Sequence, residues 1–284
     1  MRTYSHYLYP LVWGEDGQLE SPFPGALYSQ YKYGCGMAAR ALATQLFHSV
    51  RSRFAEWLQE APVYVTASAY KAVPTAAQQI CNEFVRLLDA YLLRHAGRHA
   101  LPFRIERLTV FEGDYGKLEQ TEREALMQQN LLSCNMDLQG CRVVVIDDVR
   151  ITGSHEGRVQ QLMQAAGVGE LLSLYIGKNL QPDTNGAVEH VLNHQWLHSL
   201  RQLRELMQRP HWHVNARVCK YLLSHPNTDQ LQAFWLTVPQ PQQQSILHAM
   251  DVDGYSSMPA YAATYARLAA HVHQEHTDIR LAHA

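Results

Sequence analysis

The segment from Val143 to Ser154 (VVVIDDVRITGS) carries the most distinctive chemistry in this sequence. Four apolar residues of a predicted strand lead into the adjacent acids Asp147 and Asp148, and a short loop follows them. A buried parallel strand delivers its last residues to the crevice in which open α/β sheets bind ligands. Two neighbouring carboxylates at that place can accept hydrogen bonds from the vicinal hydroxyls of a sugar.

The loop after the acidic pair is suited to a phosphate. Thr152 and Ser154 offer hydroxyls, Gly153 leaves the main chain open to close approach, and the predicted helix that follows adds N–H groups and the positive end of its dipole. A diol-binding group one loop away from a phosphate-binding group describes a site for ribose 5-phosphate. The alternative is structural, because an acidic pair at a strand end can also cap the next helix of any doubly wound protein.

The same segment resembles the phosphoribosyl-pyrophosphate (PRPP) motif of the type I phosphoribosyltransferases. In that family two acidic residues engage the ribose hydroxyls and a Thr-Gly-small loop holds the 5′-phosphate. The resemblance implies a catalytic and Mg²⁺-binding role, directly or through water, for Asp147 and Asp148. It implies 5′-phosphate binding by the residues Thr152, Gly153, Ser154 and His155.

Two positions depart from the family pattern. His155 stands where the family usually has Thr or Ser, and it could donate its ring N–H or serve only as a first-turn residue. Ile151 stands where some purine-salvage members carry an aspartate that faces the base. The resemblance therefore does not imply a base contact of the hypoxanthine–guanine type.

A second loop, residues 68–74, follows the predicted strand Val63–Ala67 and opens a predicted helix. Its small residues let an anion approach the main chain, and in the family the equivalent loop binds pyrophosphate. The resemblance implies pyrophosphate binding by Ser68, Ala69, Tyr70 and Lys71, with Lys71 as the available cation. Taken alone, the loop could equally be a plain strand-to-helix connection.

A polar excursion spans residues 111–135. Type I members carry a long loop here that closes over the reaction centre and excludes water. The resemblance makes Tyr115, Lys117 and Arg123 the lid candidates that reach inward. A solvated surface helix is the alternative.

Further segments narrow the resemblance. Tyr31-Lys32-Tyr33-Gly34 is similar to a segment of ComF-type members. Together with residues 68–75 and 214–217 it also resembles the phosphoribosyltransferases encoded in tellurite-resistance-type stress gene clusters. Those members carry a helical C-terminal extension, and they are thought to help make a nucleoside-like metabolite.

The apolar periodicity supplies the elements that must position these residues. Strands and helices alternate up to residue 176, which is typical of a parallel α/β sheet. The predicted helices of this part are 37–58, 75–95 and 155–166, and the predicted strands are 63–67, 103–110, 142–146 and 171–176. Beyond a turn-forming cluster at 181–186 the periods are helical only, at 187–208, 214–224, 228–238, 242–250 and 258–276.

The predicted fold class is therefore α/β: a parallel-sheet core like that of the type I phosphoribosyltransferases, with an all-helical C-terminal extension. We expect an irregular N-terminal leader with at most one short strand at 1–33, the α/β domain at 34–180, and the helical domain at 187–284.

Composition excludes several classes of protein. The 284 residues carry 24 Lys+Arg and 26 Asp+Glu, a formal net charge of −2, which argues against nucleic-acid binding through a basic surface. No apolar run approaches the roughly 20 residues that span a bilayer, so no membrane partner is expected. Five scattered cysteines are typical of reduced thiols in the cytoplasm.

The sequence leaves two functions open. The first is a phosphoribosyltransferase that binds PRPP and Mg²⁺, transfers phosphoribose to a nitrogenous base or base-like acceptor, and releases pyrophosphate; such an enzyme could be a homodimer. The second is a non-catalytic protein that keeps the site as a sensor of PRPP or nucleotide. Nothing in the sequence identifies the acceptor.

Overall fold

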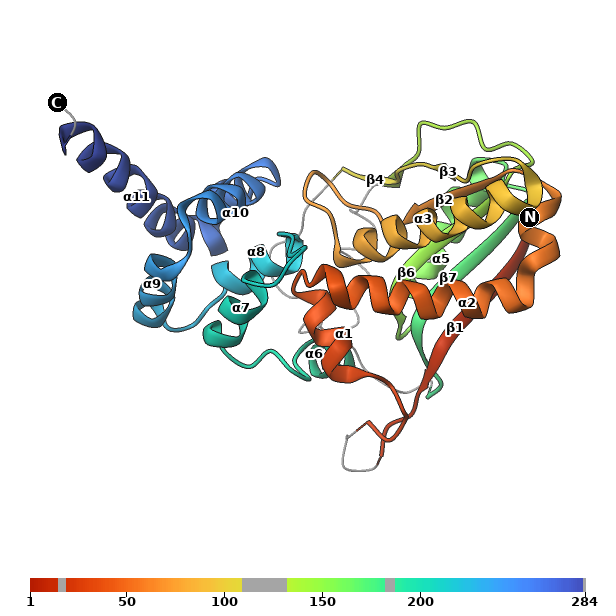
Figure 1. Ribbon diagram of the computed structural model, residues 1–284, viewed down its shortest axis with the longest axis horizontal. Coiled ribbons are helices and arrows are strands. Elements are labelled where there is room, and N and C mark those ends of the chain that lie inside the picture. The colour runs from red at the N-terminus through yellow and green to blue at the C-terminus, as the bar shows by residue number, and fades with distance from the viewer. Residues whose placement is uncertain (15–18, 109–131, 182–186, 283–284) are drawn as a thin grey trace.

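A computed structural model describes residues 1–14, 19–108, 132–181 and 187–282. Its centre is a five-stranded sheet in which every pairing is parallel, with the strand order β1-β7-β6-β2-β3 (Figure 1). A separate antiparallel pair is formed by β4 and β5. The strands are β1 (Arg2–Leu11), β2 (Val63–Ala67), β3 (Leu101–Pro102), β4 (Glu106–Arg107), β5 (Leu132–Ser133), β6 (Arg142–Arg150) and β7 (Glu170–Asn179).

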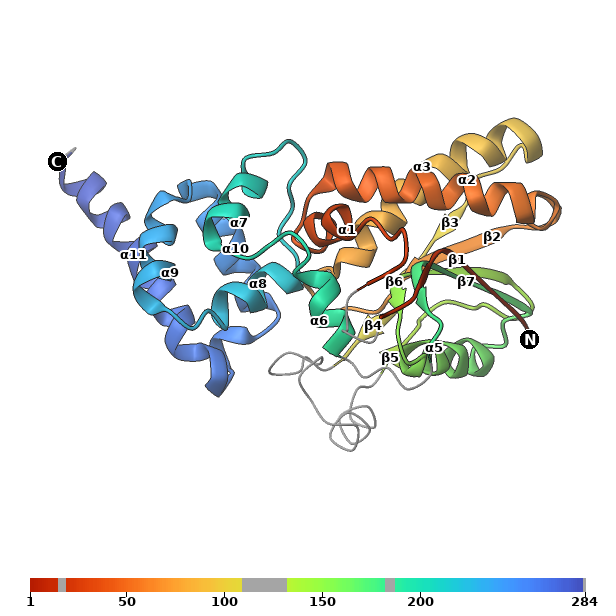
Figure 2. The ribbon, with the colours of Figure 1, turned by 90° about the horizontal axis from the view of Figure 1, so that it is seen from below.

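Helices cover both faces of the sheet. Helices α2 (Gly36–Glu60) and α3 (Ala76–Ala96) lie on one face, and α5 (Ser154–Ala165) lies on the other (Figure 2). The apolar run of β6 serves both layers, because Val144 and Ile146 pack in the core under α2 and α3 while Val143 and Val145 pack in the core under α5. A strand covered on both faces needs apolar residues at every position.

The order of strands and helices confirms the predicted fold class, and three elements differ from their predicted bounds. β6 runs to Arg150 rather than ending at residue 146, so the acidic pair lies inside the strand beside β7. Of the strand expected at 103–110, only the two residues of β4 are strand; the other short strand, β3, precedes that range, and residues 109–110 lie outside the described part. The helix expected at 187–208 is two helices, of which the second begins at the cap Ser199.

Residues 1–33 differ most from the expectation of an irregular leader. They contain the ten-residue strand β1, which pairs with β7 over its whole length, and helix α1 (Gly25–Lys32). β1 is an edge strand with one covered face, so aromatic and polar residues take the place of an apolar run. Tyr4 and His6 pack there against Phe54 of α2.

The C-terminal part is helical, as predicted. It comprises α6 (Ala187–Asn193), α7 (Leu200–Met207), α8 (Ala216–Leu223), α9 (Thr228–Thr237), α10 (Gln240–Val252), the short 3₁₀ helix η2 (Tyr255–Ser257) and α11 (Pro259–Ala282). Helices α7 to α11 extend away from the sheet (Figure 1). Among the described residues, no helix combines the length and apolarity that crossing a bilayer requires.

Main-chain hydrogen bonds join the helical part to the α/β part. The amide of Gly36 donates to His211 O (3.0 Å), that of His213 donates to Gly34 O (3.0 Å), and that of Ala216 donates to Pro74 O (3.1 Å). A Cβ at Gly36 would lie 2.2 Å from His211 O, so the two main chains can approach only because this residue is glycine.

We predict that Gly36→Ala destabilises the fold by about 1–3 kcal/mol, because the added methyl forces these backbones apart. Gly157→Ala is the matched control, since a Cβ at Gly157 meets nothing within 4 Å. Urea unfolding of both variants measures the difference. Equal stability of the two would show that the 34–36 segment does not need its close contact with residues 211–213.

Candidate functional site

Asp147 and Asp148 lie on β6 at the carboxyl edge of the sheet, both partly shielded from solvent. Asp148 Oδ2 is ion-paired with the ammonium of Lys32 at the end of α1. Asp147 accepts a hydrogen bond from the Ser68 side chain, which lies just past the end of β2. The site thus gathers residues from three places in the sequence onto one strand end.

The two carboxylates differ in charge. Burial, and next the negative charge of Asp148, raise the pKa of Asp147 to about 7. Burial would also raise the pKa of Asp148, but the Lys32 ammonium outweighs it and holds that pKa below its usual range. At neutral pH Asp148 is therefore ionised, whereas Asp147 is near its midpoint and carries its proton part of the time.

The loop after β6 has the form expected of a phosphate site. Gly153 adopts φ +81°, where a side chain would be strained, and Arg150 Nη2 lies 3.0 Å from the position of its missing Cβ. The exposed hydroxyls of Thr152 and Ser154 are 3.0 Å apart at the start of α5. These groups and the helix N-terminus together offer an anion both hydroxyls and N–H donors.

His155 joins the loop to the acidic pair. Its Nε2 lies 3.6 Å from Asp147 Oδ2. Burial, and then the charges of Arg107 and Arg158, lower the pKa of His155 to about 4. The imidazole is therefore neutral at physiological pH and can offer one N–H donor.

The predicted pyrophosphate loop lies against the same strand, but its residues point in different directions. Ser68 reaches Asp147, its amide donates to Ile146 O (3.2 Å), and Ala69 is buried. The ring of Tyr70 stacks under the guanidinium of Arg104 at 4.2 Å. Lys71 is turned away from the acidic pair, and its Nζ donates to Asp253 O (3.2 Å) in the helical part.

Sequence reasoning gave no role to Lys32, Glu189 or Arg217. Lys32 Nζ lies 3.8 Å from Glu189 Oε1 on α6, and Arg217 of α8 donates to the same oxygen at 3.3 Å. Charges of alternating sign thus run from Asp148 into the helical part. Lys32 and Arg217 belong to the segments 31–34 and 214–217 that carried the family resemblance, and this resemblance was the sequence signal that could have identified them. No such segment contains Glu189.

Three more groups near the pair have unused hydrogen-bonding capacity. The hydroxyls of Tyr28 and Tyr31 and the Nε of Arg107 are buried and have no hydrogen-bond partner among the described residues. Burial, and then the charge of Asp148, hold the pKa of both tyrosines well above the usual range, so they remain neutral donors. Tyr31 lies in the segment 31–34 that carried the family resemblance, whereas Tyr28 and Arg107 were not singled out by the sequence pattern.

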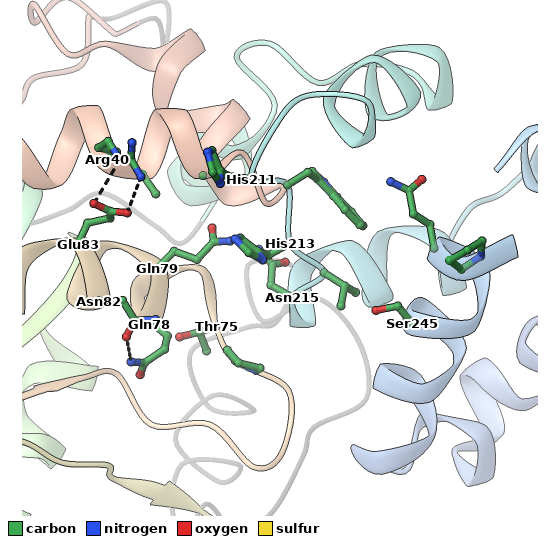
Figure 3. A pocket seen from close by; sticks show the side chains of 17 residues that line it. Arg40, Thr75, Gln78, Gln79, Asn82, Glu83, His211, His213, Asn215 and Ser245 are labelled. Atoms are coloured by element: carbon green, nitrogen blue, oxygen red, sulfur yellow. Dashed lines mark hydrogen bonds and ion pairs between the residues drawn. The ribbon is translucent and has the colours of Figure 1, made fainter. Parts of the chain in front are cut away.

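The lid candidates Tyr115, Lys117 and Arg123 lie outside the described residues. A cavity of about 540 Å³ lies beside the site, between α2, α3, residues 211–215 and α10 (Figure 3). Gln79 and His213 point toward one another in it, while Asp147 and Asp148 are not part of its lining.

The donor set fits a magnesium ion that is held mainly by its ligand. Carboxylate oxygens are the type of donor that Mg²⁺ prefers, and Mg²⁺ commonly keeps several waters. Asp148 is already ion-paired with Lys32, so Asp147 is the carboxylate that remains open to an ion or to its water shell. In the described part of the chain, no three His, Cys, Asp or Glu side chains are grouped to hold a metal by themselves.

We predict that Lys32→Met lowers stability at pH 8 by about 3 kcal/mol, because it leaves the shielded Asp148 charge without its partner. The double variant Lys32→Met/Asp148→Asn should recover most of this loss, since the uncompensated charge is then gone. Urea unfolding of the two variants tests the pair. A double variant no more stable than Lys32→Met would show that the ion pair is not what Lys32 contributes.

A second prediction concerns pH. Because the pKa of Asp147 is raised to about 7, the folded protein keeps a proton that the unfolded chain loses at lower pH. The stability contributed by that proton is present below the ordinary aspartate range and is lost as pH rises toward 7. Asp147→Asn should therefore melt above the wild type at pH 8, with the gain disappearing near pH 4.

The exposed Asp137→Asn is the control for this comparison, and it should show no such pH-dependent gain. Thermal unfolding across pH 4–8 gives the measurement. A gain for Asp147→Asn that is constant over this range would contradict the raised pKa.

Comparison with solved structures shows distant similarities. The chain is 12% identical to a purine phosphoribosyltransferase from Pyrococcus horikoshii Ot3, over 51% of this chain and 90% of the other, with a TM-score of 0.31. It is 8% identical to a hypoxanthine phosphoribosyltransferase variant from Trypanosoma cruzi in complex with IMP, over 54% of this chain and 72% of the other, with a TM-score of 0.33. It is 13% identical to a hypoxanthine-guanine phosphoribosyltransferase from Bacillus anthracis, over 54% of this chain and 76% of the other, with a TM-score of 0.29.

No curated protein sequence matches the chain. The model of the ComF-like phosphoribosyltransferase family matches residues 4–264. This match spans the sheet, the acidic pair with its loop, and most of the helical part. The protein therefore belongs to the ComF-like family of the phosphoribosyltransferases.

Proposed function

We propose that this protein binds PRPP at the carboxyl edge of β6 and transfers its phosphoribosyl group to a nitrogen nucleophile, releasing pyrophosphate. One observation carries the proposal. The acidic pair and the Thr152–Ser154 loop are joined by a three-residue connection, and His155 links them through its contact with Asp147. A ribose between them can place its hydroxyls on the carboxylates and its 5′-phosphate on the loop.

In this arrangement the protein acts by positioning and by electrostatics. Displacement of pyrophosphate at C1 passes through an oxocarbenium-like state in which positive charge grows on the ribose ring. Asp148 is kept ionised by Lys32, so its negative charge lies near the ring as that charge develops. Fixing both ends of the sugar holds C1 in line with the nucleophile, which removes part of the entropic barrier.

The departing pyrophosphate would be held by the loop 68–71 and by the buried cation Arg107. Mg²⁺, when bound, supplies charge neutralisation of the pyrophosphate, and Asp147 would contact it through water. We propose no covalent enzyme intermediate and name no nucleophile in the protein.

A second candidate, a PRPP sensor without turnover, is favoured by one observation. Lys32 is ion-paired with Asp148, and Lys71 is bound to the helical part, so two cations that could serve the reaction are held by the protein itself. Binding of PRPP is common to both candidates. Turnover separates them.

We predict that Asp147→Asn/Asp148→Asn weakens PRPP binding in the presence of Mg²⁺ by about a hundredfold or more, near 2.7 kcal/mol, because the ribose hydroxyls lose both acceptors while the fold survives. Isothermal titration calorimetry measures this. Glu56→Gln is the control: Glu56 is exposed on α2 and groups with Arg2 and Glu170 at the amino ends of the strands. Undiminished affinity in the double variant would show that the sugar lies elsewhere.

A screen of pyrophosphate release with PRPP, Mg²⁺ and a panel of nitrogenous bases then tests catalysis. Release that depends on one acceptor identifies the transferase and its substrate. PRPP binding without release on any acceptor would instead support the sensor.

A further inference from the structure

A buried carboxylate of the helical part binds the main chain of the loop that follows β2. Oδ1 of Asp253 accepts hydrogen bonds from the amides of Ala72 and Val73, each at 2.9 Å. The ammonium of Lys71 donates in turn to Asp253 O at 3.2 Å. Three consecutive residues of the loop are thus held by one residue about 180 positions later in the chain.

Asp253 is itself rigidly placed. It is 3% exposed and lies in the turn between α10 and η2. The turn is made by Gly254 at φ +81°, and a Cβ there would lie 3.6 Å from Lys71 Nζ. Tyr255, also buried, has its hydroxyl hydrogen-bonded to the Asp253 side chain.

Other contacts fix the rest of the loop and leave its middle open. The Ser68 amide donates to Ile146 O, and the Ser68 hydroxyl lies 3.3 Å from that of Thr75. Tyr70 O accepts from the amide of Arg107. The parallel bridge between Tyr70 and Glu106 also engages the Tyr70 amide, and Ala69 is fully buried. With Asp253 on the amides of Ala72 and Val73, the amide of the exposed Lys71 is the one left to face an anion.

We propose that Asp253 is a positioning residue for the pyrophosphate half of the site: it holds the loop in the conformation that presents the amide of Lys71 to the leaving group. The inference rests on the proposed function, and it makes the helical C-terminal part a component of that site. An ordered loop binds an anion without the cost of ordering its amides at the moment of binding.

The opposite reading is that Asp253 occupies the anion position and inhibits binding. Its burial inside the helical part argues against this, because the carboxylate approaches the loop through residues 72–73 and from the side of α10 and η2. The two readings predict changes of opposite sign when the carboxylate is removed.

The test compares two ligands by isothermal titration calorimetry with Mg²⁺ present. Asp253→Ala should weaken the binding of PRPP by about tenfold, near 1.4 kcal/mol, while the affinity for ribose 5-phosphate, which lacks the pyrophosphate, stays within about twofold. Asp253→Asn keeps an oxygen that can accept both amides, so it should restore PRPP binding to within about threefold of the wild type. Asp251→Ala, an exposed carboxylate two residues away, should change neither.

Each contrary outcome has a distinct meaning. Unchanged or tighter PRPP binding by Asp253→Ala would overturn the inference, the second result indicating inhibition. An equal loss for both ligands would also overturn it, because it would show a general structural role. A wild-type protein that binds neither ligand would reject the proposed function, and this inference with it; wild-type binding of PRPP with an unaffected variant would reject the inference alone.

Discussion

The ion pair between Lys32 and Asp148 is the constraint on which the rest of the site depends. Adjacent carboxylates at a shielded strand end repel each other, and burial penalises the charge of each. The ammonium of Lys32 stabilises the negative charge of Asp148. The proton on Asp147 removes the second negative charge and with it the repulsion. For Lys32 to reach the strand, α1 must lie over the carboxyl edge of the sheet. The ion pairs of Glu189 with Lys32 and with Arg217 then hold α6 and α8 beside the same edge.

This constraint explains why the helical part is built into the α/β part. Three of its contacts with that part are made at or next to the candidate site: 211–213 against 34–36, Ala216 against Pro74, and Asp253 against the loop 71–73. Asn215 links two of these contacts, since it caps α8 and donates to Lys32 O at 3.2 Å. A displacement of the helices would therefore reach the acidic pair and the loop 68–74 together.

Local patterns in the sequence were sufficient for the central elements, and long-range contacts were not visible in it. The apolar run before Asp147, the β2 strand and the apolar periodicity of α2 each reflect the burial of their own residues. These patterns therefore predict structure directly. β1 was missed because an edge strand is covered on one face and can be built from Tyr, Ser and His. The role of Asp253 could not be inferred, because an isolated acid in a turn shows nothing of a loop that precedes it by 180 residues.

The unequal charges of the pair also bear on how a ligand would enter. PRPP brings phosphate charges that must be neutralised, and the described cations near the pair are already engaged, except for the buried Nε of Arg107. On the proposed function, a divalent cation arriving with PRPP would add positive charge beside Asp147 and lower its pKa, so the proton would leave as the complex forms. Lys32 cannot be displaced in the same way, because it is 8% exposed and Glu189 lies on its other side. The proton on Asp147 is thus the positive charge that a bound cation can replace. The ion pair between Lys32 and Asp148 stays formed and keeps the strand end in place.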